Sequence, residues 1–181
     1  MQKKPWPLHD VRHWLEPGPV VLISSHWQGK SNIMTLGWHT ILEFSPSLVG
    51  LMISSGNISF DMIRQSGECV INLPDVSLAD TVARIGNCDG DQHDKLAEFG
   101  LTAEKSERIA APSIAECHAN FECRVYDEAM VDRYNFFVME VIAARVKPQP
   151  EWPQTLHYTG NGVFRTDGER LDKRHLFTKV S

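Results

Sequence analysis

The sequence lacks the features that mark several large classes of protein. Its 181 residues contain no run approaching the ~18 apolar residues of a membrane-spanning helix. No cluster of Lys or Arg forms a basic patch, and the net charge at pH 7 is −5. We therefore expect no membrane partner and no nucleic-acid partner. The N-terminus has two lysines but no apolar stretch behind them, which predicts no secretory signal and a cytoplasmic protein.

Cysteine is also scarce. Four cysteines in a chain of this length are too few for a disulfide scaffold, and no Cys-X-X-Cys pair is present. The sequence therefore predicts buried thiols and no metal site. It also lacks a Gly-X-Gly-X-X-Gly segment, which excludes a Rossmann-type dinucleotide site.

The composition is that of an ordinary globular protein, with 42% hydrophobic and 23% charged residues. The length fits one domain on the usual scale of roughly 100–200 residues. We expect a single domain over residues 1–181, with its core at about 17–146. Residues 147–181 are rich in Pro, Gly and charge and are interpreted as a C-terminal extension.

Hydrophobic periodicity predicts mainly strands with a few helices. The predicted strands cover residues 20–26, 32–44, 48–53, 69–73, 119–127 and 136–146, with a further ordered segment at 156–164. The predicted helices cover residues 8–15, 59–66, 77–85 and 95–99, and Gly67 is expected to close the second of them. Several short strands with few helices favour a closed or nearly closed antiparallel barrel.

Two of these strands have a distinctive pattern. Residues 48–53 are apolar on both alternating faces, so both faces need cover, and Gly50 indicates a bend or a close backbone approach. Residues 119–127 alternate between apolar and polar side chains, which predicts a half-buried strand with Asn120, Glu122, Arg124 and Tyr126 on its polar face.

Four consecutive blocks between Pro17 and Pro74 carry a family pattern. They read PGPVVLIS, NIMTLGWHT, FSPSLVGLMIS and NISFDMIRQSGECVINLP. Weaker matches continue to about residue 146. This order resembles the flavin reductase-like family. The resemblance implies a mainly β, antiparallel Greek-key fold, the FMN-binding split barrel, and a homodimer with FMN held non-covalently at the subunit boundary.

The resemblance places the FMN phosphate at the start of the helix predicted from residue 59. Backbone N–H groups at a helix start attract anions, and side-chain donors there add to the effect. Ser59 alone would also suit plain helix capping, but with the family pattern around it we favour phosphate binding. The candidate donors are Ser54, Ser55, Asn57 and Ser59.

The same resemblance places the isoalloxazine ring along residues 34–40. Donors aimed at the N1 and O2 edge of the ring would stabilise reduced flavin. Thr35 and Thr40 are candidate donors, and Gly37 allows close backbone approach. Trp38 is a candidate to stack near the ring, with barrel core as the alternative. The full set of candidates is Met34, Thr35, Leu36, Gly37, Trp38 and Thr40.

A basic residue later in the family pattern approaches the phosphate. This chain has Asp89-Gly90-Asp91 where the family often has Ser-Gly and a basic residue. Lys95 is therefore the expected counter-charge, with Arg64 as a second candidate and a solvated surface lysine as the alternative. His157 and Tyr158 are candidates to approach a substrate, although a half-exposed strand pair is the favoured interpretation.

The resemblance implies a flavoprotein oxidoreductase. NADH or NADPH would reduce the bound FMN, and electrons would pass to free flavin, a partner oxygenase or another small acceptor. No catalytic side chain is assigned, because the cofactor carries the chemistry. One alternative is an FMN-binding electron-carrier module without nicotinamide turnover. Another is a pyridoxamine-phosphate oxidase-like enzyme, although residues 34–40 look more like flavin reductase.

Overall fold

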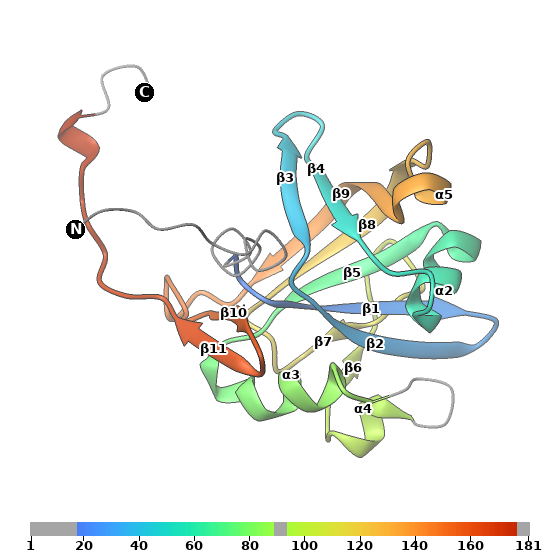
Figure 1. Cartoon of the computed structure of the whole chain (residues 1–181), viewed down its shortest axis with the longest axis horizontal. Helices are drawn as coiled ribbons and strands as arrows, with labels where there is room; N and C mark the ends of the chain where they lie inside the picture. Colours follow the sequence, from blue (N-terminus) through green and yellow to red (C-terminus); the bar gives the residue numbers. More distant parts are fainter. Residues whose placement is uncertain (1–17, 89–93, 177–181) are drawn as a thin grey trace, which may run out of the picture.

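The computed structural model describes residues 18–88 and 94–176. Within them, seven strands form one antiparallel sheet in the order β2-β1-β5-β8-β9-β4-β3 (Figure 1). The predicted antiparallel barrel is confirmed. The strands are β1 (Val21–Trp27), β2 (Lys30–Leu36), β3 (His39–Glu43), β4 (Leu48–Met52), β5 (Glu68–Leu73), β8 (Ala119–Asp127) and β9 (Phe136–Val146). The helix expected at 8–15 and the segment Asp89-Gly90-Asp91 lie outside the described residues.

The barrel closes at the short joint between β2 and β3. These strands lie at opposite edges of the sheet, yet only Gly37 and Trp38 separate them. Such a joint spans about 10 Å at most, so the two edges must meet and the sheet must curl. The prediction of one strand over residues 32–44 was wrong, because the chain bends at this joint and β3 pairs with β4 instead of β1.

β4 is covered on its core face and partly on the other, where Leu48 and Met52 are half-buried. Val49 and Leu51 belong to the barrel core. On the other face the ring of Phe136 lies against Gly50, so closely that a Cβ on this glycine would stand 2.1 Å from the ring Cζ. The predicted close approach at Gly50 is confirmed.

The helices lie around the barrel. They are α2 (Ile58–Ser66), the 3-10 turn η2 (Val76–Leu78), α3 (Ala79–Ile85), α4 (Lys95–Glu98), α5 (Val131–Tyr134) and the 3-10 turn η3 (Arg174–Leu176). α2 packs Phe60 into the core, where its ring meets the edge of Phe137 at 5.2 Å. It ends at Gly67 in the left-handed conformation, as predicted. None of the helices described is long and apolar enough to cross a membrane.

A second apolar cluster lies outside the barrel, between β1 and α3. Because side chains alternate along a strand, Val21 and Ile23 face the barrel interior while Leu22 faces α3. Val82 and Ile85 of α3 pack against this outer face. Both faces of β1 are therefore buried.

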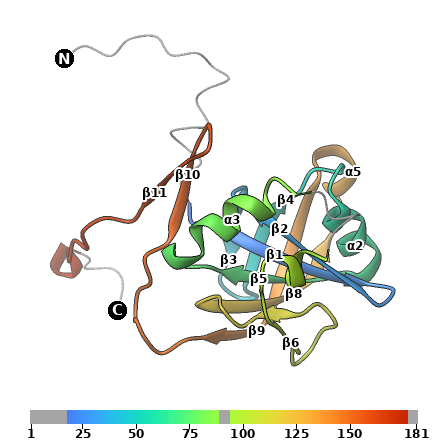
Figure 2. The same ribbon diagram turned by 90° about the horizontal axis from the view of Figure 1, so that it is seen from below.

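A hairpin of β10 (Leu156–Gly160) and β11 (Val163–Thr166) lies beside α3 in both views (Figures 1 and 2). Leu156 joins the outer apolar cluster, and its carbonyl accepts a hydrogen bond from the Val20 N–H. Residues beyond 146, interpreted from sequence as an extension, thus contribute to the packed body of the protein.

The polar face of β8 is buried in its first half, at Asn120 and Glu122, whereas Arg124 and Tyr126 further along are exposed as predicted. A loop carrying β6 (Ala103–Glu104) and β7 (Ser113–Ile114) covers the buried half. The Glu122 carboxylate accepts hydrogen bonds from the N–H groups of Glu107 at 2.7 Å and Arg108 at 2.8 Å. This loop has no strand periodicity of its own, so the alternation within β8 could not reveal its cover.

Candidate functional site

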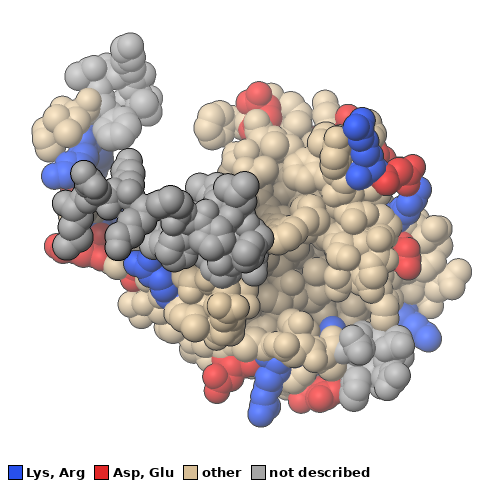
Figure 3. Space-filling model, viewed as in Figure 1, with Lys and Arg blue, Asp and Glu red and all other residues tan. Residues whose placement is uncertain are grey.

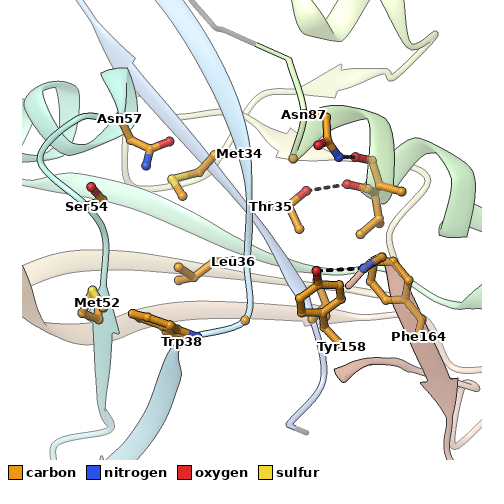
Figure 4. A pocket seen from close by; sticks show the side chains of 16 residues that line it. Met34, Thr35, Leu36, Trp38, Met52, Ser54, Asn57, Asn87, Tyr158 and Phe164 are labelled. Carbon is orange, nitrogen blue, oxygen red and sulfur yellow. Dashed lines mark hydrogen bonds between the residues drawn. The ribbon is translucent and has the colours of Figure 1, made fainter. Parts of the chain in front are cut away.

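A cavity of about 490 Å³ lies over β2, between the start of α2, the end of α3 and the β10–β11 hairpin (Figure 4). Two walls border it. The first comes from the barrel strands and the start of α2: Met34, Thr35, Leu36, Gly37, Trp38, Met52, Ser54 and Asn57. The second comes from α3 and the hairpin, with Val20 beside them: Val82, Ala83, Gly86, Asn87, Tyr158, Gly162 and Phe164.

An adjoining hollow of about 310 Å³ extends the cavity toward α4. The two share part of their lining, including Asn57 and Asn87, and so lie side by side. The hollow adds Lys95, the single charged side chain among the described residues that line either part. Together the cavity and the hollow therefore run from a cationic, amide-rich end to an uncharged end rich in aromatic rings.

The residues of β2 reach the cavity in the alternating manner of a strand. Met34 and Leu36 point to one side of β2 and Thr35 to the other (Figure 4). The Thr35 hydroxyl donates a hydrogen bond of 2.7 Å to the Val82 carbonyl. The Thr35 hydroxyl, which was expected to contact flavin, therefore links β2 to α3 through this hydrogen bond. Trp38 stands in the wall with 47% of its surface exposed, so the barrel-core alternative for it is wrong.

Three sequence candidates, Thr40, Ser55 and Ser59, lie outside the lining. Thr40 is exposed on β3, and its hydroxyl is 3.3 Å from the Ile41 carbonyl. Ser55 is exposed in the turn before α2. The strand break at Gly37-Trp38 explains the position of Thr40, because β3 leaves the cavity along the opposite edge of the sheet.

The start of α2 presents Asn57 to the cavity. Asn57 is the N-cap residue in an extended conformation, yet its side chain makes no capping hydrogen bond. In Figure 4 this side chain is turned toward Met34 and the cavity, near Ser54. Backbone N–H groups at the first turn of this nine-residue helix give this end of the site a positive character.

Ser59 occupies a different environment from the one predicted. Its side chain is fully buried, and its hydroxyl accepts hydrogen bonds from Asn32 Nδ2 at 3.0 Å and Ser25 Oγ at 3.2 Å. It lies one residue inside the helix, on the face that packs against β1 and β2. Its side chain is therefore neither the helix cap nor part of the cavity lining.

Lys95 is the cation that reaches the site. It is only 5% exposed, and its Nζ lies 3.5 Å from the Ile85 carbonyl, so it is not a solvated surface lysine. Asp94 caps the short α4 by accepting from the Ala97 N–H at 3.2 Å. The other candidate, Arg64, forms an ion pair of 2.7 Å with Asp132.

Sequence reasoning missed most of the second wall. The helix over residues 77–85 was predicted, but nothing in its periodicity indicates that its C-terminal end meets β2. Tyr158 was considered from its position alone, whereas Phe164 and Gly162 gave no signal. The aromatic composition of residues 156–164 is the one feature that pointed toward an apolar wall.

The cysteines lie mostly away from this cavity, and none of the four forms a disulfide. Burial raises the pKa of the Cys117 thiol to about 12. A hydrogen bond with Cys123, together with burial, raises the pKa of Cys69 well above its ordinary value. Cys88 is half-buried and lines the hollow beside Lys95.

The surface around the site is largely uncharged. In the face shown in Figure 3, residues other than Lys, Arg, Asp and Glu form most of the central surface, and charged side chains lie mainly toward the periphery. A split antiparallel barrel with a long cavity at the joint between its edge strands defines the structural class of this protein. The sequence model of the flavin reductase like domain matches residues 13–166, and the chain belongs to this family.

Individual relatives agree with this assignment. An uncharacterized protein from Archaeoglobus fulgidus is 35% identical over 113 residues, which cover 62% of this chain and 64% of that protein. The FMN-binding domain of a flavin reductases-like enzyme from Shewanella baltica is 26% identical, with a TM-score of 0.79 and coverage of 92% and 95% of the two chains. Flavoredoxin from Methanosarcina acetivorans is 25% identical, with a TM-score of 0.84 and coverage of 99% and 98%.

Proposed function

We propose that this protein binds FMN non-covalently across the cavity and the adjoining hollow and acts as an oxidoreductase that uses NADH or NADPH. Electrons would pass to free flavin, a partner oxygenase or another small acceptor. One observation carries the proposal: the two ends of the cavity differ chemically as the two ends of FMN do. A phosphate with nearly two negative charges suits Lys95 and the start of α2. A flat, largely apolar ring suits the uncharged remainder.

The residues on the first wall would hold the cofactor. Asn57, Ser54 and the first N–H groups of α2 would donate to the phosphate oxygens, and Lys95 would supply the counter-charge. Met34, Leu36 and Trp38 would border the ring, with Gly37 allowing the backbone to approach it. When bound, FMN supplies the capacity to accept and release hydride. No Asp, Glu or His lines the described part of the cavity, so this chain's contribution is to position ligands and exclude water.

A second candidate is an electron-carrier module that holds FMN without nicotinamide turnover. The similarity to the flavoredoxin from Methanosarcina acetivorans supports this electron-carrier function as the alternative. Anaerobic addition of NADH or NADPH to the FMN-loaded protein separates the two functions. Bleaching of the flavin absorption is expected for the oxidoreductase, and its absence with both nucleotides would leave the carrier function.

We also propose that the protein is a cytoplasmic homodimer. The edge strand β3 and the turn after it expose large apolar side chains, with Ile41 at 67% and Phe44 at 90%. Exposed apolar residues on a strand edge are a common site of self-association. Light scattering at micromolar concentration should give the mass of two chains.

Lys95→Met tests the phosphate assignment. A hydrogen bond to a charged group contributes roughly 1.5–3 kcal/mol, so we expect FMN to bind about ten- to a hundredfold more weakly. Riboflavin, which has no phosphate, should bind as before. Lys105→Met, at an exposed position, is the matched control. Equal weakening of FMN and riboflavin by Lys95→Met would contradict the proposal.

A further inference from the structure

Val20 occupies the corner where the two walls of the cavity meet. It lines the cavity and is only 2% exposed, yet it lies just outside the sheet. The ladders of β1 begin only after it, at Val21 toward β2 and at Leu22 toward β5. The position of Val20 is therefore set by contacts beyond the two ladders.

Two hydrogen bonds hold this corner, one on each side. The Val20 N–H donates to the Leu156 carbonyl at the base of the β10–β11 hairpin, at 2.6 Å. The carbonyl of the preceding residue, Pro19, accepts from Nε2 of His39 at 2.7 Å. Because proline has no N–H group, this carbonyl is the one polar group through which its backbone can be held. Residues 19 and 20 thus bridge the barrel, through His39, and the hairpin, through Leu156.

The His39 ring reaches Pro19 from a fixed backbone. His39 pairs with Leu51 in the ladder between β3 and β4, and it is half-buried, whereas the following residues of β3 are exposed. The carbonyl of the neighbouring Trp38 accepts the Met52 N–H at 3.0 Å. Since a carbonyl oxygen can only accept, Nε2 of His39 carries the hydrogen in its bond to Pro19. A donor in this place orients the segment before β1 from outside the cavity.

We propose that His39 is a positioning residue of the flavin site. By holding the Pro19 carbonyl it fixes Val20, and through the Val20 N–H it sets the place of the hairpin base, two residues before Tyr158. Trp38, next to His39, and Tyr158 border opposite sides of this part of the cavity (Figure 4). His39 therefore joins the two walls at the end where the flavin ring is proposed to lie. This inference rests on the proposed FMN function, because it assigns a residue that shapes the same site.

Two polar substitutions test the hydrogen bond to Pro19. In His39→Gln the side-chain amide nitrogen can reach the position of Nε2, whereas in His39→Asn it stops near the position of Nδ1. Hydrogen exchange in the protein without flavin follows the Val20 N–H. We expect this amide to exchange about three- to tenfold faster in His39→Asn, as for loss of one neutral hydrogen bond, and at the wild-type rate in His39→Gln.

Flavin binding gives the second readout. Because His39 acts at the ring end, away from Lys95, FMN and riboflavin should both bind about three- to tenfold more weakly to His39→Asn, with a shift in the visible bands of the bound flavin. His39→Gln should restore both affinities. The control is His26→Gln, which removes the 2.9 Å bond between His26 Nδ1 and Ser31 Oγ near the other end of β1. Its flavin affinities should equal those of the wild type.

The outcomes separate the inference from the proposed function. Unchanged Val20 exchange or unchanged flavin affinity in His39→Asn, weaker binding of FMN alone, or failure of His39→Gln to restore binding would each overturn the inference and leave the proposed function intact. A wild-type protein that binds neither flavin would refute the proposed function and, with it, the inference. If His39→Asn fails to fold, His39→Gln, which must match the wild type in both readouts, keeps the inference testable.

Discussion

The two walls of the cavity differ in how the fold holds them. The first wall is part of the barrel, because β2, β4 and the start of α2 are fixed by the ladder of the sheet and the barrel core. The second wall is added from outside, by α3 and a hairpin more than 100 residues away from β2 in sequence. It is secured by the outer apolar cluster and by single bonds such as Thr35 to Val82. The first wall is therefore fixed by the barrel as a whole, and the second by a smaller set of contacts.

The largest expected effect comes from Gly50→Ala. Gly50 lies on β4, the strand that carries Met52 of the first wall. In Gly50→Ala the new methyl group would stand 2.1 Å from the Phe136 ring, so ring or strand must move. Overpacking of this kind costs about 1–3 kcal/mol, and sometimes more. Urea unfolding should show the loss, and a second substitution, Phe136→Leu, should recover part of it.

Gly168→Ala is the matched control for this experiment. No atom lies within 4 Å of the position its Cβ would take, and its stability should be nearly unchanged. If Gly50→Ala unfolds at the same urea concentration as the wild type, β4 accommodates the methyl group at no cost in stability. The first wall would then be no more rigid than the second.

An intermediate effect is expected from Ser59→Ala. The substitution leaves Asn32 Nδ2 without its buried acceptor, which costs about 1–3 kcal/mol, while Ser25 Oγ keeps Met62 Sδ as an acceptor at 3.4 Å. Because the hydroxyl does not line the cavity, FMN and riboflavin affinities should shift together, by a small factor. Ser47→Ala, at an exposed position, is the control. Weaker binding of FMN alone would instead support the phosphate anchor that the sequence suggested for Ser59.

The smallest effect is a difference in thiol reactivity between the core and the cavity. Cys69, Cys117 and Cys123 are at most 1% exposed, and burial keeps the Cys117 thiol protonated by raising its pKa to about 12. Since the thiolate is the reactive form, a thiol reagent at pH 8 should label Cys88 first. FMN should slow that reaction, because Cys88 lines the hollow beside Lys95. The Cys88→Ser protein should lose the fast phase, and fast labelling of a second thiol would argue against the packed core.

The sequence correctly predicted those elements whose local hydrophobic pattern matches the position that they take in the fold. Alternating apolar residues located β8 and β9, and Gly67 correctly ended α2. Residues 34–38 and Lys95 were placed at the site by family pattern, and the structure brings them to the cavity and the adjoining hollow.

The rest depended on contacts between distant segments. Whether Ser59 faces outward depends on the exact phase of the first helical turn, which a capping pattern does not specify. The burial of Glu122 depends on a loop that has no periodicity. The break at Gly37-Trp38 follows from closure of the whole barrel, since the residues on both sides of it form strands.

The order of strands in the sheet also governs how the chain must fold as it is made. β4 pairs with β9 through residues such as Leu48 and Glu140, which lie about ninety residues apart in the sequence. Non-local pairing of this kind slows folding, because a long loop must close before any contact forms. During synthesis, the apolar strand β4 leaves the ribosome well before β9 exists to cover it. The nascent chain therefore exposes this apolar strand before its partner is made, and exposed, unpaired strands of this kind favour aggregation.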